Sequence, residues 1–431
     1  MASRSSRRGR TPRSARTTAG LTEGLAGPVV AVESHPPAFI QAAWRAHPPL
    51  HAAPLAVAGP DGRITHACPL AARDGVARGQ SVAQGRLLQP DLVVVPPDPV
   101  TAALLYDDLL HTLVALSPVV EAADPDVGVA YLDGRGQAGL WGDEPACWDG
   151  LALARAAARA LFDREIGARA GAGPTRVVAL ALARRMGPGG PRALAGDAAR
   201  EFLRALPLDD PALGLTPGVV GALRDLGVVT ASALAALPRA GVALRFGADA
   251  LGAWDAASGV AGLALRPWAP PERLVVTHRI EGGIEDGEAL RGIVRRLGAV
   301  LGERLEGRGA ATLTVRLGCA DGARHARRGR YGPPLAAPAT VVAAVLEILA
   351  RTPVASPVED VEIGATDLRA PDVTQPNLWG DEETAGRRAR LATALAAHDR
   401  RHGAGLLQRW RPDPLAEGGW ARDEGIMGPT P

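Results

Sequence analysis

The residues best suited to chemistry lie in the segment 117–136, which reads SPVVEAADPDVGVAYLDGRG. Apolar residues alternate on both sides of an acidic cluster, a pattern that predicts a buried hairpin with carboxylates at its turn. The acidic residues of the segment are Glu121, Asp124, Asp126 and Asp133. Carboxylates on a rigid strand edge suit Mg²⁺, which needs oxygen ligands and leaves other positions for water and substrate phosphates. An acidic turn on an ordinary hairpin would give the same letters.

This segment resembles the second palm motif of Y-family translesion DNA polymerases, where an SP-x-VE-x-x-S-x-DE stretch precedes a Y/W-LD. SPVVE and YLDGRG take those places here, and further motifs agree over nearly the whole chain. The resemblance implies an α+β fold of Y-family architecture, with palm, fingers, a helical thumb with a helix-hairpin-helix, a βαββαβ little finger and flexible termini. It also implies a DNA-directed DNA polymerase, a nucleotidyltransferase that uses Mg²⁺.

The first predicted strand, 28–33, is followed by a predicted helix over 37–45 and a strand over 54–57. In the resembling family the first strand ends in a catalytic Asp, and the spacing to the next prolines places that position at Ser34. Glu33 is adjacent, but neighbours on a strand point to opposite faces, so it substitutes only if the register slips by one. Phe39 falls on the family's aromatic sugar gate, a nucleotide-binding position, although packing in the core would explain it equally well.

The stretch 64–99 resembles the family's fingers segment, with Gly75, Val76 and Gly79 among the matching positions. The triphosphate-binding Tyr and Arg of that segment fall on Pro69 and Ala72. Neither side chain can donate a hydrogen bond to a phosphate. The usual mode of nucleotide binding is therefore not expected.

The family's Asp-Glu pair is also incomplete. Counting forward from Ser117 places it on Asp126 and Val127, and counting back from Tyr131 places it on Gly128 and Val129. The metal and catalytic set then has at best Asp126, helped by Glu33 or Asp124, which is poor for two Mg²⁺ ions that repel each other. Loss of these acids, with LDGRGQAGLWG at 132–142, resembles the ImuB-like inducible-mutagenesis branch of the family, whose members act as adaptors.

A helix is predicted over 148–169, followed by a strand-to-helix turn within 171–185. Arg176 takes the place of the family's basic residue that reaches the incoming triphosphate, and a simple helix start at Pro174 and Thr175 explains the same letters. Further on, two short helices are predicted to flank Leu226-Gly227-Val228. Gly227 permits the tight turn of a helix-hairpin-helix, whose backbone N–H groups can face a DNA phosphate, although a helical hairpin without DNA remains the alternative.

After the proline-rich linker at 267–271, strands at 274–280, 311–317 and 358–363 and helices at 288–305 and 341–349 predict a βαββαβ order. The resemblance identifies this region as the little finger, which grips DNA. The predicted DNA-binding arginines are Arg316, Arg324, Arg327, Arg328 and Arg330. Charges that protect an edge strand from aggregation are the alternative.

Gln375, Leu378 and Trp379, within PDVTQPNLW, resemble the Q-x-x-L-[FW] peptide by which bacterial DNA polymerases bind the sliding clamp. An extended glutamine with two apolar anchors suits docking into a groove. Trp379 packing back on its own domain is the alternative.

The 431 residues carry a formal net charge of only +2, with arginines gathered in the first sixteen positions and at 316–330. Three widely spaced cysteines, Cys68, Cys147 and Cys319, predict a reducing compartment and no zinc site. No apolar stretch approaches the roughly twenty residues that span a bilayer, and no apolar signal segment follows the N-terminal charges. We therefore expect a cytoplasmic protein with no membrane partner.

The predicted organisation is a disordered basic tail (1–27), palm and fingers (28–172), thumb (173–262), little finger (263–370) and a tail with the clamp peptide (371–431). The expected function is that of a DNA-binding adaptor in DNA repair and SOS mutagenesis by translesion synthesis. It would bind damaged primer-template DNA and link the sliding clamp to a partner polymerase and a mutasome accessory protein, without Mg²⁺. An active translesion polymerase that uses Mg²⁺ with rearranged acids, and a scaffold protein that does not bind DNA, are the alternatives.

Overall fold

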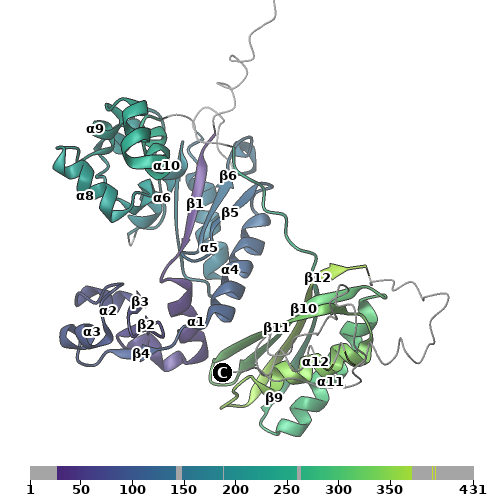
Figure 1. Cartoon of the computed structure of the whole chain (residues 1–431). Coiled ribbons are helices and arrows are strands. Elements are labelled where there is room, and N and C mark those ends of the chain that lie inside the picture. Colours follow the sequence, from purple (N-terminus) through teal and green to yellow (C-terminus); the bar gives the residue numbers. More distant parts are fainter. Residues whose placement is uncertain are drawn as a thin grey trace, which may run out of the picture. The chain divides into compact units, whose positions relative to one another are not determined.

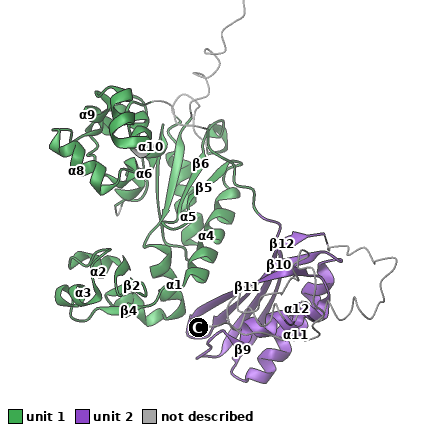
Figure 2. Cartoon of the chain, viewed as in Figure 1, with its two compact units in different colours: residues 1–270 green, residues 271–431 purple. Residues whose placement is uncertain are grey.

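The computed structural model describes residues 27–141, 148–187, 189–259 and 264–370, together with Leu391 and Ala394. The chain divides into two compact units, unit 1 over residues 1–270 and unit 2 over residues 271–431 (Figure 2). The predicted flexible termini, 1–27 and 371–431, lie almost wholly outside the described residues. The finer division of unit 1 into palm, fingers and thumb stays a prediction.

A five-stranded sheet forms the centre of unit 1, in the order β5-β6-β1-β7-β8. Its strands are β1 (Val29–Ser34), β5 (Val120–Asp124), β6 (Val129–Asp133), β7 (Ala168–Gly173) and β8 (Arg192–Ala193). The predicted hairpin is confirmed as β5 and β6, with Asp124 and Asp126 at its turn. β1 pairs antiparallel with both β6 and β7, so the first strand of the chain lies in the middle of the sheet.

Side chains of β1 alternate between two buried faces, which explains why the strand is apolar almost throughout. Val30 and Val32 pack with α4 (Pro99–Val114) and α5 (Leu151–Phe162) on one face. Ala31 packs with α6 (Arg176–Arg184) on the other face (Figure 1). A Cβ on Gly171 of β7 would overlap the backbone of Ala183, so only glycine lets α6 lie this close to the sheet.

The helix predicted over 148–169 is wrong at its C-terminal end. α5 ends at Phe162, and residues 168–173 form β7, whose pairing with β1 outweighs the helical propensity of the alanines. Glu165, with φ of 57°, and Gly167, which has no room for a side chain against the His35 carbonyl, separate the two elements. Phe162, one of the apolar residues at helical spacing in this segment, is 74% exposed.

A three-stranded sheet of order β3-β2-β4 forms a second core of unit 1. Its strands are β2 (Leu55–Ala58), β3 (Ile64–Ala67) and β4 (Val93–Val95), and its helices are α1 (Ala38–Ala46), α2 (Pro69–Arg73) and α3 (Val82–Leu88). Ile40, Leu55 and Ile64 are fully buried in its core. This is the region predicted as the fingers.

The third core of unit 1 is helical and includes one side of α6. Its other helices are α7 (Gly196–Ala205), α8 (Pro217–Asp225), α9 (Ala231–Ala235) and α10 (Arg239–Ala257). Gly227 joins α8 to α9 with φ of 76°, as the predicted tight turn requires, and Gly247 kinks α10 with φ of 79°. Short 3₁₀ helices at Pro48–Ala52, Ala138–Leu140 and Pro211–Leu213 complete the unit.

The end of unit 1 runs along the edge strand β5. The backbone N–H of Trp268 donates to the Val120 carbonyl (2.6 Å), and that of Arg266 donates to the Glu121 carboxylate (2.6 Å). The Trp268 ring packs edge-on against His111 of α4, with centroids 5.1 Å apart. Part of the predicted linker is therefore fastened to the five-stranded sheet.

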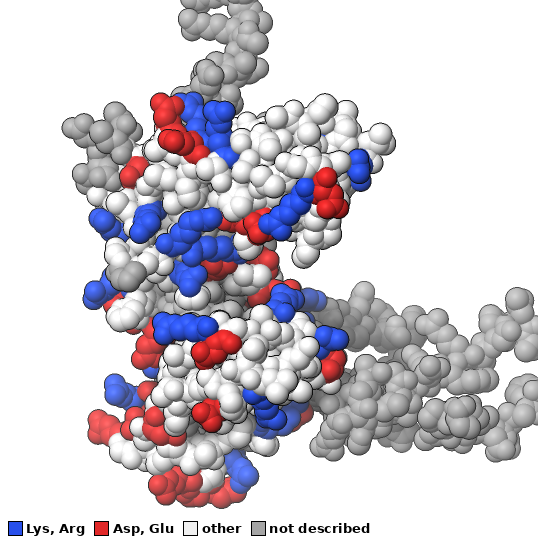
Figure 3. Space-filling view, turned by 90° about the vertical axis from the view of Figure 1, so that its left-hand side faces the viewer, with Lys and Arg blue, Asp and Glu red and all other residues white. Residues whose placement is uncertain are grey.

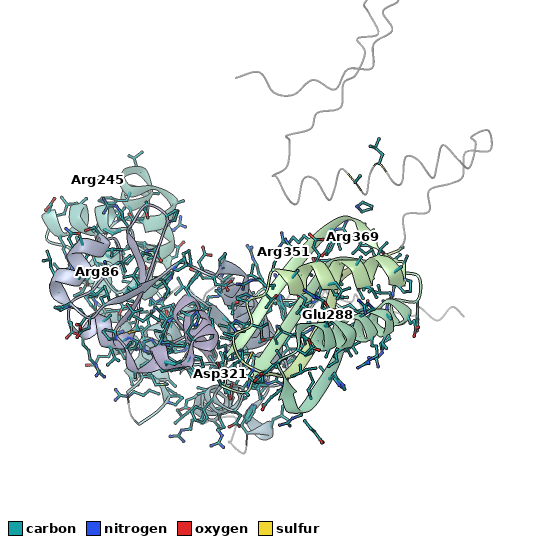
Figure 4. The ribbon with its side chains drawn as sticks, turned by 90° about the horizontal axis from the view of Figure 1, so that it is seen from below. Arg86, Arg245, Glu288, Asp321, Arg351 and Arg369 are labelled. Carbon is teal, nitrogen blue, oxygen red and sulfur yellow. The ribbon has the colours of Figure 1, made fainter. Side chains whose placement is uncertain are left out.

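Unit 2 confirms the predicted βαββαβ order, with a four-stranded antiparallel sheet arranged β11-β10-β12-β9. Its elements are β9 (Leu274–Ile284), α11 (Gly287–Arg304), β10 (Gly309–Cys319), β11 (Arg324–Leu335), α12 (Pro338–Ala350) and β12 (Val358–Arg369). Figure 4, where Asp321 marks the β10–β11 turn and Glu288 the first turn of α11, shows α11 and α12 side by side. Leu313, Val315 and Leu317 of β10 face these helices and form the core with them.

Among the described residues, no helix combines the length and apolar character needed to cross a bilayer. Cys68 and Cys319 are buried and free, and Cys147 lies outside the described residues.

Candidate functional site

Ser34 and Gly128, two positions where the resembling family carries acids, lie against each other. The backbone N–H of Ser34 donates to the Gly128 carbonyl at 3.0 Å. A Cβ built on Gly128 would lie 2.5 Å from Ser34 Oγ, and Gly128 has φ of 80°. In the frame counted back from Tyr131, the two positions therefore meet in the structure, as a hydroxyl and a glycine.

Glu33 is committed to an ion pair. Its Oε1 accepts hydrogen bonds from Arg184 Nε at 2.8 Å and from Nη2 at 2.7 Å, and the two side chains are only 10% and 21% exposed. The register of β1 has no slip, because Glu33 pairs with Val129 and Arg169 across the sheet. Glu33 therefore faces α6, on the opposite side from that needed to replace Ser34 in the family pattern.

A second guanidinium group, that of Arg169, makes this place more basic. Arg169 contacts Nε2 of His35, and its Nη1 donates to the Arg184 carbonyl at 3.2 Å. Burial, with the charge of Arg169 adding to it, lowers the pKa of His35 to about 4, so its imidazole is neutral at pH 7. Burial also lowers the pKa of Arg169, an effect that the Glu33 charge opposes. Two guanidinium groups thus share one carboxylate.

Asp126 lies in the exposed turn of the β5–β6 hairpin. Its backbone N–H and that of Val127 donate to Asp124 Oδ1 at 3.0 and 3.1 Å, which fixes the turn. Burial lowers the pKa of His66 in the three-stranded sheet region, and the Asp126 charge opposes this shift, so the turn faces that region.

Two Mg²⁺ ions do not fit this donor set. The described residues hold no group of three or more His, Cys, Asp or Glu side chains able to bind a metal ion. Ser34 and Gly128 offer at most one neutral oxygen, and Glu33 already accepts two charged hydrogen bonds. Metal ions close together need several carboxylate charges to offset their repulsion.

Arg176 is predicted to reach a triphosphate, and the structure shows it bound to the protein. Its Nη2 lies 2.6 Å from Glu121 Oε2, and its guanidinium lies 5.8 Å from the Tyr131 ring centroid. Burial raises the pKa of Tyr131 to about 12, which keeps the phenol neutral at pH 7. Arg176 and Arg184, at the two ends of α6, thus join the helix to Glu121 and Glu33 of the sheet.

Phe39, the predicted sugar gate, packs on the core of the three-stranded sheet region. Its ring stacks on His66 with centroids 4.8 Å apart and an interplanar angle of 22°. The packing alternative weighed for this residue therefore describes its contacts.

One face of the unit 2 sheet gathers the predicted DNA-binding arginines. The register places Arg324, Arg328 and Arg330 of β11 opposite Gly318, Thr314 and Thr312 of β10, and Arg316 belongs to the same set. These residues alternate with Leu313, Val315 and Leu317, so they face away from α11 and α12. Arg327 is opposite Val315 and lies on the helix side of the sheet, unlike the other four.

Figure 3 shows basic and acidic side chains next to one another over much of the visible face. Gly227, in the predicted helix-hairpin-helix, lies between the exposed Leu226 and the buried Val228. The clamp-peptide residues Gln375, Leu378 and Trp379 lie outside the described residues.

Sequence reasoning missed Arg184 and Arg169. The available signal was the pair Arg176 and Arg184 at the two ends of a predicted helix next to a strand that carries acids. Arg184 meets Glu33 across 151 positions, a pairing that no local pattern contains.

Two family models match the chain. The impB/mucB/samB family model matches residues 37–184, and the impB/mucB/samB family C-terminal domain model matches residues 273–378, together more than half of the chain. The first match covers Phe39, Asp126 and Arg176, and the second covers the arginines of the unit 2 sheet.

Curated relatives and solved structures also match. Protein ImuB from Caulobacter vibrioides, in strains NA1000 / CB15N and ATCC 19089 / CIP 103742 / CB 15, is 35% identical over 274 residues, 59% of this chain and 56% of the relative. The chain thus matches little more than half the length of these relatives. DinB from Sulfolobus solfataricus shows 17% identity and a TM-score of 0.47, over 80% of this chain and 100% of that chain. An insertion ternary complex of Dbh DNA polymerase shows 17% identity and a TM-score of 0.47, over 79% and 99%.

Proposed function

The chain belongs to the impB/mucB/samB family, and we propose from this that it is a DNA-binding, non-catalytic adaptor in damage-induced translesion synthesis. The observation that carries DNA binding is the row of arginines along β11 on one face of the unit 2 sheet, Arg324, Arg328 and Arg330. Guanidinium groups bind phosphates and release counterions without reading bases. The contact would therefore serve primer-template DNA of any sequence.

We propose that the chain is not catalytic because the carboxylates expected at a polymerase active site are missing or already paired. Ser34 and Gly128 occupy the places of family carboxylates, and Glu33 is held by Arg184. An active polymerase with a rearranged acid set would depend on Asp126. Purified protein should show no more nucleotide incorporation with Mg²⁺ or Mn²⁺ than an Asp126→Ala variant, and extension that Asp126→Ala abolishes would overturn the proposal.

DNA binding is tested by fluorescence anisotropy over a range of salt concentrations. The triple variant Arg324→Ala, Arg328→Ala, Arg330→Ala should weaken binding to all sequences alike and flatten the salt slope by up to about 0.9 per lost phosphate contact. Arg327→Ala is the matched control, because it removes an arginine of the same strand from the opposite face. Equal losses in both variants would show that this face of the sheet is not the DNA surface. A wild type that does not bind DNA would favour the scaffold alternative.

The adaptor role includes the sliding clamp, for which 375–379 is the proposed anchor. Replacing a buried interface tryptophan commonly costs about 2 kcal/mol or more, roughly a thirtyfold loss of affinity. A bacterial clamp should bind the wild type more tightly than a Leu378→Ala, Trp379→Ala variant with the same melting temperature. Equal affinities would exclude this anchor. The partner polymerase and mutasome accessory protein, like the cytoplasmic location, are proposals carried by the resemblance.

A further inference from the structure

The face of the unit 2 sheet that carries the arginines is divided by charge. Across the sheet, one register row joins Ala326, Arg316, Glu362 and Thr277, and the next joins Arg324, Gly318, Asp360 and Arg279. Residues directly opposite one another in an antiparallel sheet share a face. The basic strands β11 and β10 thus border two carboxylates on β12, Glu362 and Asp360.

Glu362 contacts two arginines on this face. Its Oε1 is bound by Arg273 Nη2 and lies 3.6 Å from Arg316 Nε. The side chains of Arg273, Arg316 and Glu362 are 24%, 23% and 29% exposed, so the group is half-withdrawn from water and less screened than a surface ion pair. A single carboxylate therefore offsets the charge of two guanidinium groups at the border of the basic strip.

We propose that Glu362 limits the affinity for the nucleic-acid backbone by holding Arg316 away from phosphate, so that the footprint ends between β10 and β12. This rests on the proposed DNA-binding function and adds a restraint to it. To bind a phosphate, Arg316 must first give up its contact with the Glu362 carboxylate. In addition, Glu362 and Asp360 repel any phosphate that lies near β12. The result is a contact that releases DNA readily, as a protein that hands a primer end to another enzyme requires.

The test is a double-mutant cycle measured by anisotropy on duplex DNA at several salt concentrations. Glu362→Gln should raise affinity several-fold and steepen the salt slope by about one unit, since roughly one more phosphate contact forms. In the Arg316→Gln background, Glu362→Gln should bring no gain in affinity, because the guanidinium group that it would release is missing. Glu303→Gln is the control, because it removes an exposed carboxylate from α11, on the other side of the sheet, with the same change in net charge.

Each outcome decides the inference. A wild type without salt-dependent binding removes the DNA-binding function and the restraint together. The restraint alone is excluded if the wild type binds DNA and the affinity of Glu362→Gln is the same. It is also excluded if the affinity of Glu303→Gln rises as much as that of Glu362→Gln. If Glu362→Gln melts well below the wild type, Glu362→Thr, which suits a strand, replaces it in the cycle.

Discussion

Replacing Glu33 with glutamine tests which of two roles its carboxylate has, that of a structural ion-pair partner or that of a metal ligand. In the structure the Glu33 carboxylate accepts from Nε and Nη2 of Arg184, and Arg169 lies beside them. Glu33→Gln leaves a guanidinium group that is 79% buried without its countercharge, next to a second one. A metal ligand behaves in the opposite way, because removing one of several carboxylates that repel one another stabilises a protein without its metal.

Removing one partner of a fully buried ion pair costs about 3–5 kcal/mol. Both side chains keep some exposure and glutamine can still accept a hydrogen bond, so we expect a loss of about 2 kcal/mol in the free energy of unfolding. That is a large part of the ~5–15 kcal/mol that stabilises a typical domain.

The assay is urea unfolding of unit 1 followed by tryptophan fluorescence, since Trp44, Trp141, Trp148, Trp254 and Trp268 belong to this unit. Glu201→Gln, an exposed change on α7, should stay within about 0.5 kcal/mol of the wild type. Millimolar Mg²⁺ should leave the wild-type midpoint unchanged. An unfolding free energy of Glu33→Gln equal to or above that of the wild type would refute the structural role of the pair.

Three further changes follow from the same unit. Gly171→Ala should cost at least about 2 kcal/mol in urea unfolding, because its Cβ would meet the backbone of α6, whereas Gly221→Ala on α8, with open space around it, should not destabilise. Burial lowers the pKa of His35 from 6.5 to about 4 in the folded protein. Between these two pH values the imidazole is therefore protonated in the unfolded chain and neutral in the folded one. Stability should therefore be full above pH 6.5 and fall by up to roughly 3 kcal/mol towards pH 4, and in His35→Gln this part of the pH dependence should be missing. Glu121→Ala should speed amide hydrogen exchange over 264–268, because the Arg266 N–H loses its acceptor, and unchanged exchange would show that Glu121 does not hold this segment.

Local pattern was enough for most of the fold. Alternation gave the β5–β6 hairpin and the βαββαβ order of unit 2, and the two family matches confirm the family predicted from motifs. It failed at Ala168–Gly173, where alanine and arginine favour a helix and pairing with β1 imposes a strand. Phe162 also fits the helical spacing of 148–169, and yet it is 74% exposed at the end of α5.

The site was predictable only in part, because its contacts join distant segments. Counting residues left two frames for the family's acidic pair, and only one of them includes Gly128, which lies against Ser34 in the structure. It could not show that Glu33 meets Arg184, because that contact joins segments far apart in the chain. The opposite faces of Arg327 and Arg328 follow from alternation once 324–335 is known to be a strand, but which of the two faces the helices depends on the packing of the sheet.

Single substitutions cannot easily introduce an acidic pair at positions 34 and 128, because each substitution alone would destabilise the protein. A side chain at position 128 would place its Cβ 2.5 Å from Ser34 Oγ on a backbone with φ of 80°. Each acid introduced alone would cost on the order of 1–3 kcal/mol, through strain at 128 or through unpaired charge at 34. Neither step restores a metal site by itself, so selection would meet a less stable protein before any gain. Such epistasis acts as a ratchet, because Ser34 and Gly128 are easier to keep together than to replace one at a time.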